Sequence, residues 1–426
     1  MHLPSDSNSP PESAPLHLSN KPGAIPPAGT VARPPLSPKV VFQAPNARAG
    51  QDYRGSLREV AGNGRVLQFK EIGLPENLAL ILSEEGELLG VPGVAGDHLI
   101  TFQWSIDGLS WNASQCVLLV NPDPRSLWQI NEPASDAIYP KPHSAAQALD
   151  AGDLKIAAAS RRGRSHEHAG LFRDDDFYVQ HDASSGWSVL LVADGAGSAK
   201  YSRCGSKRAV ETAGEHLLAA LKGDLGASIN HALQGWDADP ASISGQIGKQ
   251  FHALFYDAAA VAVDAIEQAA ISQQSEARDY ATTLLAAAVK REGGQLFLAT
   301  FWIGDGAIAA YGPRGKVRLM GLPDSGEFAG QTRFLDRAAL TSDRFAERVK
   351  IGRYTDISAV VLMSDGISDP KFETDKGLAS GDKWDALWDE IAPCLAADQP
   401  EQSLLDWMGF FIPGHHDDRS MALIWA

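Results

Sequence analysis

Two strongly apolar segments each run directly into an Asp-Gly pair, and this pattern restricts the fold more than any other feature of the chain. Residues 189–193 precede Asp194 and Gly195, and residues 359–364 precede Asp365 and Gly366. Short apolar runs of this kind are typical of buried strands. Because a glycine after the carboxylate lets the backbone turn away, each Asp is expected to project into a cleft from the end of its strand.

Three more acidic groups stand next to apolar runs. Asp174, Asp175 and Asp176 precede residues 177–179, Asp305 lies between two glycines after residues 300–303, and Asp417 and Asp418 precede residues 421–425. A single Asp-Gly pair is more often an ordinary turn than a ligand. Five such positions in one region indicate that the carboxylates serve one site.

A convergent group of carboxylates indicates a site for divalent cations. Without a counter-charge the groups would repel one another and raise one another's pKa. Ligand sets made only of oxygen favour Mg²⁺ or Mn²⁺ over zinc. Two such ions can share a hydroxide and orient it for attack on phosphorus, so the residues favour hydrolysis of phosphate esters.

The chain divides into four segments. Residues 1–38 hold ten of the 25 prolines and are predicted to be a disordered leader, either a solvated spacer or a proline-rich ligand for a partner. Residues 40–121 alternate apolar and polar positions between turn signals, which predicts a small antiparallel β-sandwich. Residues 122–150 contain further prolines and are predicted to be a linker. Residues 151–426 mix strand and helix patterns and predict an α+β domain, with helices expected at 204–221, 245–272, 384–396 and 402–410.

Composition narrows the class of partner and the compartment. The formal charge of −16 argues against nucleic acid as a partner. The three cysteines, Cys116, Cys204 and Cys394, are far apart, so neither a disulfide framework nor a zinc ribbon is indicated. No signal peptide and no apolar run long enough to span a membrane is present. These features predict a soluble, cytoplasmic protein without a membrane partner. The absence of GxSxG, P-loop and HExxH motifs disfavours other hydrolase and ATPase classes.

The acidic segments resemble, in the same order, those of the metal-dependent protein phosphatases of type 2C, also called PPM. Residues 173–179 (RDDDFYV) look like the family's NEDAFxV segment, and residues 192–199 (VADGAGSA) look like the form found in its bacterial DGAGSA subgroup. Residues 281–284, 303–306, 363–366 and 417–420 are similar to its Thr-Thr strand, GDS turn, SDG and closing D-[DN]-x-[ST] motifs.

The resemblance implies an α-β-β-α sandwich with metals at one edge. By position, Asp194 would bridge two ions, Asp175 and the Gly195 carbonyl would serve one, and Asp365 and Asp417 would hold the other. Asp305 would help to hold a weaker third ion, and Asp174 would reach a metal through water. Asp176 could replace Asp175 if the loop differed by one residue; we prefer Asp175 because it keeps Phe177 and Val179 on apolar positions.

The sequence departs from the family at the phosphate-binding Arg, whose position holds Gly170. His166 is the first candidate to replace it, Arg164 the second, and Arg173 a third, in a polar segment that is otherwise a solvated basic loop. The family's His after Asp-Gly is also missing, since Ala196 stands there. Protonation of the leaving group would then come from metal-bound water or another residue.

Residues 49–57, 73–75, 86–92 and 96 resemble a cadherin-related immunoglobulin-like repeat, in which GLPxxL and GxLxGxP mark two turns. No catalytic residues come with this resemblance. The whole sequence thus predicts a Mn²⁺- or Mg²⁺-dependent phosphatase for phosphoserine and phosphothreonine in proteins, opposing a cognate kinase. The alternatives are a phosphoprotein-binding module without turnover and a phosphatase for small phosphate esters.

Overall fold

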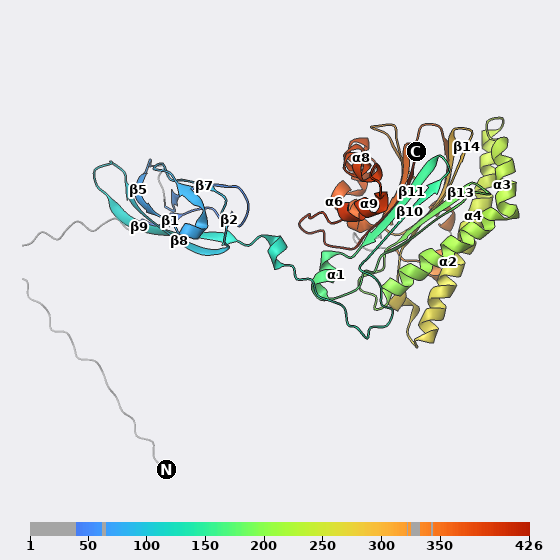
Figure 1. Cartoon of the computed structure of the whole chain (residues 1–426), viewed down its shortest axis with the longest axis horizontal. Helices are drawn as coiled ribbons and strands as arrows, with labels where there is room; N and C mark the ends of the chain where they lie inside the picture. The colour runs from blue at the N-terminus through green and yellow to red at the C-terminus, as the bar shows by residue number, and fades with distance from the viewer. Residues whose placement is uncertain (1–39, 62–64, 322, 325–332, 342–343) are drawn as a thin grey trace, which may run out of the picture. The chain divides into compact units, whose positions relative to one another are not determined.

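The computed structural model describes residues 40–61, 65–321, 323–324, 333–341 and 344–426 (Figure 1). The chain separates into two compact units at Asp123 and Pro124. The predicted leader, residues 1–38, lies outside the described residues. None of the described helices combines the length and the apolar character that crossing a membrane requires.

The first unit is built from short strands. One sheet has the order β2-β9-β8-β5, a second has β3-β7-β6, and β1 pairs with β4. Neighbouring strands are antiparallel except β2 and β9. The strands are β1 (Phe42–Gln43), β2 (Ala47–Arg48), β3 (Tyr53–Ser56), β4 (Arg58–Glu59), β5 (Gln68–Gly73), β6 (Leu80–Leu82), β7 (Glu87–Gly90), β8 (Gly96–Ser105) and β9 (Asn112–Asn121).

Alternation along these strands builds the core of the first unit. Ile100, Phe102 and Trp104 of β8 are buried, while Leu99 and Thr101 on either side of Ile100 are exposed. Successive side chains of a strand point to opposite faces, so one face of β8 meets the core. There Phe42 lies 5.0 Å from Phe102, measured between ring centroids, in an edge-to-face contact.

Two antiparallel sheets form the centre of the second unit. The six-stranded sheet has the order β10-β11-β20-β19-β16-β17, and the five-stranded sheet has β12-β13-β14-β15-β18. The strands are β10 (Ser144–Ala151), β11 (Leu154–Arg161), β12 (Asp176–Asp182), β13 (Trp187–Ala193), β14 (Leu284–Glu292), β15 (Gln295–Ile303), β16 (Ala307–Tyr311), β17 (Val317–Leu319), β18 (Val349–Tyr354), β19 (Ala359–Met363) and β20 (Arg419–Trp425).

Helices cover the outer faces of both sheets, on opposite sides of the strands in Figure 1. Leu190 of β13 and Leu362 of β19 share one buried cluster, so the inner faces of the sheets pack together. Leu191 of β13 faces the other way, toward α2 and α4. The helices are α1 (Arg164–Ala169), α2 (Ser202–Lys222), α3 (Asp224–Gln234), α4 (Pro240–Ser272), α5 (Arg337–Leu340), α6 (Asp365–Phe372), α7 (Asp375–Leu378), α8 (Gly381–Leu395) and α9 (Pro400–Trp407).

The mixture of helices and strands expected after residue 151 is confirmed, and two details differ from expectation. Helix α4 begins at Pro240 rather than at residue 245, because the Asp239 side chain accepts a hydrogen bond from the Ser242 amide and proline suits the first helical turn. Within the residues expected to form a linker, β10 pairs with β11 as the edge strand of the six-stranded sheet.

Candidate active site

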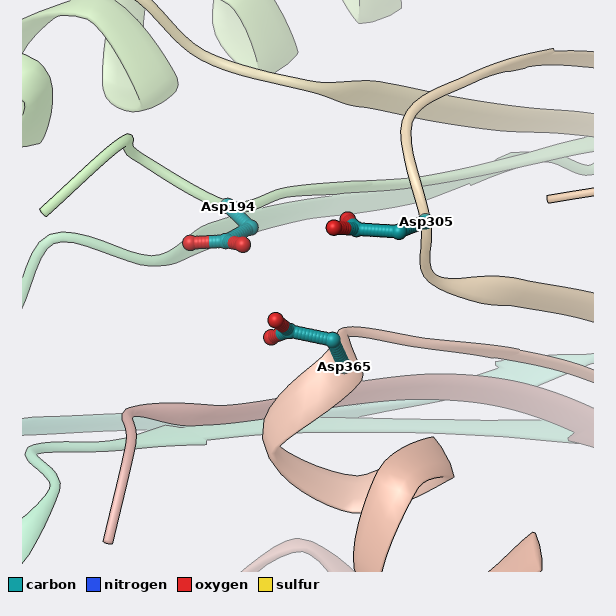
Figure 2. A group of neighbouring side chains, drawn as sticks. All are labelled: Asp194, Asp305 and Asp365. Atoms are coloured by element: carbon teal, nitrogen blue, oxygen red, sulfur yellow. The ribbon is translucent and has the colours of Figure 1, made fainter. Parts of the chain in front are cut away.

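Three carboxyl groups from separate parts of the second unit converge in one place. Figure 2 shows Asp194 at the end of β13, Asp305 in the turn between β15 and β16, and Asp365 at the start of α6. One carboxyl oxygen of each lies within 4.8 Å of the other two. The two Asp-Gly strand ends identified in the sequence therefore meet, and they are joined by the Asp of the third Asp-Gly pair.

Local backbone contacts fix Asp194 and Gly195. The Asp194 amide donates to the Thr283 hydroxyl at 2.9 Å, and its carbonyl accepts from the Thr283 amide at 2.8 Å. A Cβ on Gly195 would lie 2.8 Å from the Asp174 carbonyl oxygen and 2.9 Å from Ser202, so no side chain fits there. The Thr-Thr segment at the start of β14 thus anchors the strand end that carries the central carboxylate.

The three consecutive aspartates of residues 174–176 face different surroundings. Asp175 is buried, and its carboxylate accepts from the Ser364 hydroxyl at 2.8 Å, next to Asp365. Asp176 instead pairs with Lys141, whose Nζ lies 2.9 Å from its Oδ2. In this structure Asp175 is the member of the triple that joins the acidic group.

Asp417 and Asp418 also have different surroundings. Asp417 is exposed and lies at the edge of the acidic group. Asp418 is buried and accepts from the Gly163 amide at 2.6 Å and from His166 Nδ1 at 3.0 Å. It also accepts from the Asp174 amide at 2.5 Å, so this carboxylate ties the loop of the triple aspartate to α1 and β20.

The electrostatics of the group are those of unneutralised carboxylates. Burial, followed by the charges of Asp365, Asp175 and Asp417, raises the pKa of Asp194 well above its usual range. Burial and neighbouring carboxylates such as Asp305 raise the pKa of Asp365 in the same way. Burial, and then the charge of Asp418, raises the pKa of Asp175 to about 7. Asp417 is exposed as a residue, but its carboxyl group has lost part of its water contacts, and this loss with the adjacent Asp418 raises its pKa.

This donor set fits divalent cations. Asp194 and Asp365 form no ion pair with lysine or arginine within the described residues, although their oxygens are close together. An all-oxygen set with this much negative charge suits Mg²⁺ or Mn²⁺. The oxygens of Asp194, Asp305 and Asp365 lie close enough together to share an ion, and the Asp175 carboxylate and the charge of Asp417 act on Asp194.

His166 lies between two carboxylates. Its Nδ1 is 3.0 Å from Asp418, and its Nε2 is 3.8 Å from Asp174 Oδ2. Burial alone would lower the pKa of His166, but the hydrogen bond and charge of Asp418 and the charge of Asp174 raise it to about 9. Burial raises the pKa of Asp174 to about 6 against the opposing charge of His166. Both ring nitrogens of this candidate phosphate ligand therefore already face acidic partners.

The two arginines considered for phosphate binding point elsewhere. Arg164 Nη2 donates to the Gly409 carbonyl at 3.4 Å, and its guanidinium lies 5.5 Å from the centre of the Phe411 ring. Arg173 is buried, and its Nη1 donates to the Asp175 carbonyl at 2.8 Å. Gly170, at the family's arginine position, adopts a φ of 66° at the end of α1.

Lys141 is a site residue that the sequence analysis missed. It is buried, and its Nζ donates to the Asp175 carbonyl at 2.7 Å while it pairs with Asp176. A lysine between two prolines in an expected linker carries no motif. Its surroundings are created only when this segment packs against the loop of the triple aspartate.

Residues 128–131, near the start of the second unit, contact α1. The Asn131 amide donates to the Glu167 carbonyl at 2.8 Å, and its side chain donates to the His168 carbonyl at 2.6 Å. The Trp128 ring lies 4.5 Å from the His416 ring, measured between centroids. Residues 128–131 are thus packed on the helix that carries His166.

Comparison with known proteins identifies the class. The family model described as "Protein phosphatase 2C" matches residues 162–409, which is more than half of the chain, so the chain belongs to this family. A search of curated proteins finds no match.

Solved structures similar to this chain share little sequence with it. A bacterial serine phosphatase is 12% identical with a TM-score of 0.36, and covers 66% of this chain and 98% of its own. Serine/threonine phosphatase Stp1 from Staphylococcus aureus is 13% identical with a TM-score of 0.37, and covers 69% and 99%. RsbX in complex with magnesium is 14% identical with a TM-score of 0.32, and covers 66% and 99%. At these values the assignment rests on the family model.

Proposed function

We propose that the protein hydrolyses phosphoserine and phosphothreonine in proteins, using two Mn²⁺ or Mg²⁺ ions, and that it opposes a cognate kinase. The observation that carries this proposal is the convergence of Asp194, Asp305 and Asp365 within 4.8 Å in a chain of the Protein phosphatase 2C family. Bound at the carboxylates, such ions would activate water for in-line attack on phosphorus.

The chain's own residues would each have a definite role. Asp194, whose carboxyl lies near those of Asp175 and Asp365, would serve both ions. Asp175 and the Gly195 carbonyl would hold one ion, and Asp365 with Asp417 would hold the other. Asp305 would help to hold a weaker third ion. Asp174, held by His166, would contribute through water. The two sheets with their outer helices are proposed to be the family's α-β-β-α sandwich, of the bacterial DGAGSA subgroup.

The remaining parts are assigned by the same proposal. Residues 151–426 would be the phosphatase domain, and residues 40–121 an immunoglobulin-like accessory domain that binds or positions a phosphoprotein. Residues 122–150 would connect the two and would complete the phosphatase domain with β10 and Lys141. We expect the protein to act in the cytoplasm, without a nucleic acid or membrane partner.

Hydrolysis of p-nitrophenyl phosphate and of a phosphothreonine peptide, with and without Mn²⁺, tests the proposal. We expect metal-dependent turnover of both, and at least about a hundredfold lower kcat/KM for Asp194→Asn, or about 2.7 kcal/mol, because its charge offsets both ions. Near-normal kcat in Asp194→Asn at saturating Mn²⁺, with an intact circular dichroism spectrum, would contradict it.

A second candidate function is a phosphoprotein-binding module without turnover. The observation that favours it is Gly170 at the position of the usual phosphate-binding arginine, together with His166 held between Asp418 and Asp174. This candidate predicts binding of the phosphothreonine peptide without hydrolysis of either substrate. Turnover of p-nitrophenyl phosphate alone would indicate instead a phosphatase for small esters.

A further inference from the structure

Three arginines gather around the loop at Gly409, beside the acidic group. Arg161 ends β11 and is paired in register with Arg419, which begins β20, and Arg164 begins α1. Arg164 Nη2 donates to the Gly409 carbonyl at 3.4 Å, and a Cβ on Gly409 would lie 3.6 Å from the Arg161 Cζ. We refer to Arg161, Arg164 and Arg419 as the arginine cluster.

The members of the arginine cluster differ in what they contact. Arg419 is buried, donates to the carbonyls of Phe410 and His415, and lies 3.7 Å from the centre of the Phe410 ring. Arg161 and Arg164 are only partly buried, and neither forms an ion pair with a carboxylate in the part of the chain that the structure describes. Arg419 is therefore structural, whereas Arg161 and the N–H groups of Arg164 other than the one that donates to Gly409 could bind a carboxylate.

Positive charge is concentrated here in a chain whose formal charge is −16. Three guanidinium groups lie around the same loop, and none of them is paired with a carboxylate within the described residues. Asp417 and Glu167 act on Arg419 from nearby, but neither forms an ion pair with the arginine cluster. Such a local excess of positive charge attracts an anion.

The location of the arginine cluster suggests which anion. A phosphate that is to be hydrolysed must reach Asp194, Asp305 and Asp365, but the acidic neighbour of the arginine cluster is Asp417, the exposed residue at the edge of the group. A group bound by the arginines would lie beside the reacting phosphate. In a protein substrate, that place belongs to a side chain near the phosphorylated residue.

We propose that Arg161 and Arg164 bind an acidic side chain flanking the phosphorylated residue, so that the site selects phosphoserine or phosphothreonine in acidic segments. This inference rests on the proposed phosphatase function and adds a substrate class to it. The planar guanidinium matches a carboxylate with two parallel hydrogen bonds. The contact of Arg164 with Phe411 restricts the side chain before binding, which lowers the entropy lost on association.

The test compares two phosphothreonine peptides that differ only in their flanks, Asp and Glu in one and Asn and Gln in the other. For the full-length wild-type protein with Mn²⁺, we expect kcat/KM to favour the acidic peptide by roughly fivefold or more. In Arg161→Gln and Arg164→Gln this ratio should fall toward one, and Arg161→Glu should favour the neutral peptide. Arg314→Gln is the matched control, because Arg314 pairs with Asp389 beyond the far end of β16 from Asp305, and should keep the wild-type ratio.

A wild-type ratio near one would overturn the inference. A ratio that stays unchanged in the variants would also overturn it, including the case in which both peptides lose equally because the arginines hold the reacting phosphate. If the wild-type protein turns over neither peptide, the proposed function fails. The ratio of the peptides' dissociation constants, from fluorescence anisotropy, then tests the arginines by the same criteria.

Discussion

Asp175 and Asp176 are neighbours in the chain, but only Asp175 faces the acidic group. We expect Asp175→Ala to weaken Mn²⁺ binding at least about tenfold, because it removes a charged group that is a proposed ligand. Asp176→Ala should instead lower the free energy of unfolding by about 3 kcal/mol, since it leaves Lys141 buried without its partner. Isothermal titration with Mn²⁺ and urea unfolding of both variants separate the two effects. Equal losses of Mn²⁺ affinity would show that the two carboxylates share the ligand role.

Lys141 fixes the loop of the triple aspartate, because its Nζ donates a hydrogen bond to the Asp175 carbonyl. We expect Lys141→Met to reduce the rise in Tm that Mn²⁺ produces, because the loop loses the donor that fixes Asp175. Lys383→Met is the matched control: Lys383 Nζ also donates to a backbone carbonyl, that of Phe372, at 2.9 Å. Differential scanning fluorimetry with and without Mn²⁺ measures the effect. An unchanged Mn²⁺-induced rise in Lys141→Met would rule out this positioning role.

At the scale of elements, the turn between β8 and β9 depends on one carboxylate. Asp107 accepts from the amides of Leu109 and Ser110 and from the Ser105 hydroxyl, and these bonds lower its pKa to about 2. Because the folded-state pKa is below the unfolded value, the stabilisation is present above about pH 4 and is lost as the pH falls toward 2. Residues 40–123 should therefore lose stability over this range, and the Asp107→Asn fragment should lose less. Urea unfolding at pH 5, 4 and 2.5 measures it, and identical pH dependences would contradict the prediction.

For the whole molecule, the boundary of the catalytic unit can be tested by truncation. A fragment of residues 124–426 should keep the Mn²⁺-dependent activity of the full chain on p-nitrophenyl phosphate, because it holds every proposed ligand. A fragment that starts at Lys155 should be unstable or have weaker Mn²⁺ binding, because it lacks β10 and Lys141. Circular dichroism and Mn²⁺ titration of both fragments check this. Equal behaviour of the two would show that residues 124–154 are dispensable.

The site residues that could be predicted from the sequence are those whose signals lie next to one another in the chain. Asp194 and Asp365 were recognisable because the apolar strand, the carboxylate and the glycine are adjacent in the chain. The roles of Lys141 and Asp418 could not be predicted, because their partners Asp175 and His166 lie 34 and 252 residues away in the chain. The proposed phosphate role of His166 rested on its position in a basic segment, which gave no sign of the two carboxylates around it.

The packing of residues 128–131 on α1 has a mechanical consequence. Tension applied to the chain from the first unit reaches the hydrogen bonds of Asn131 to Glu167 and His168 before it reaches either sheet. Helix α1 is a single short helix whose His166 is bonded to Asp418. The first contacts to bear such a load therefore lie beside the proposed metal ligands, and a protein anchored through its first unit would feel a pull at this site before any strand of its sheets is disturbed.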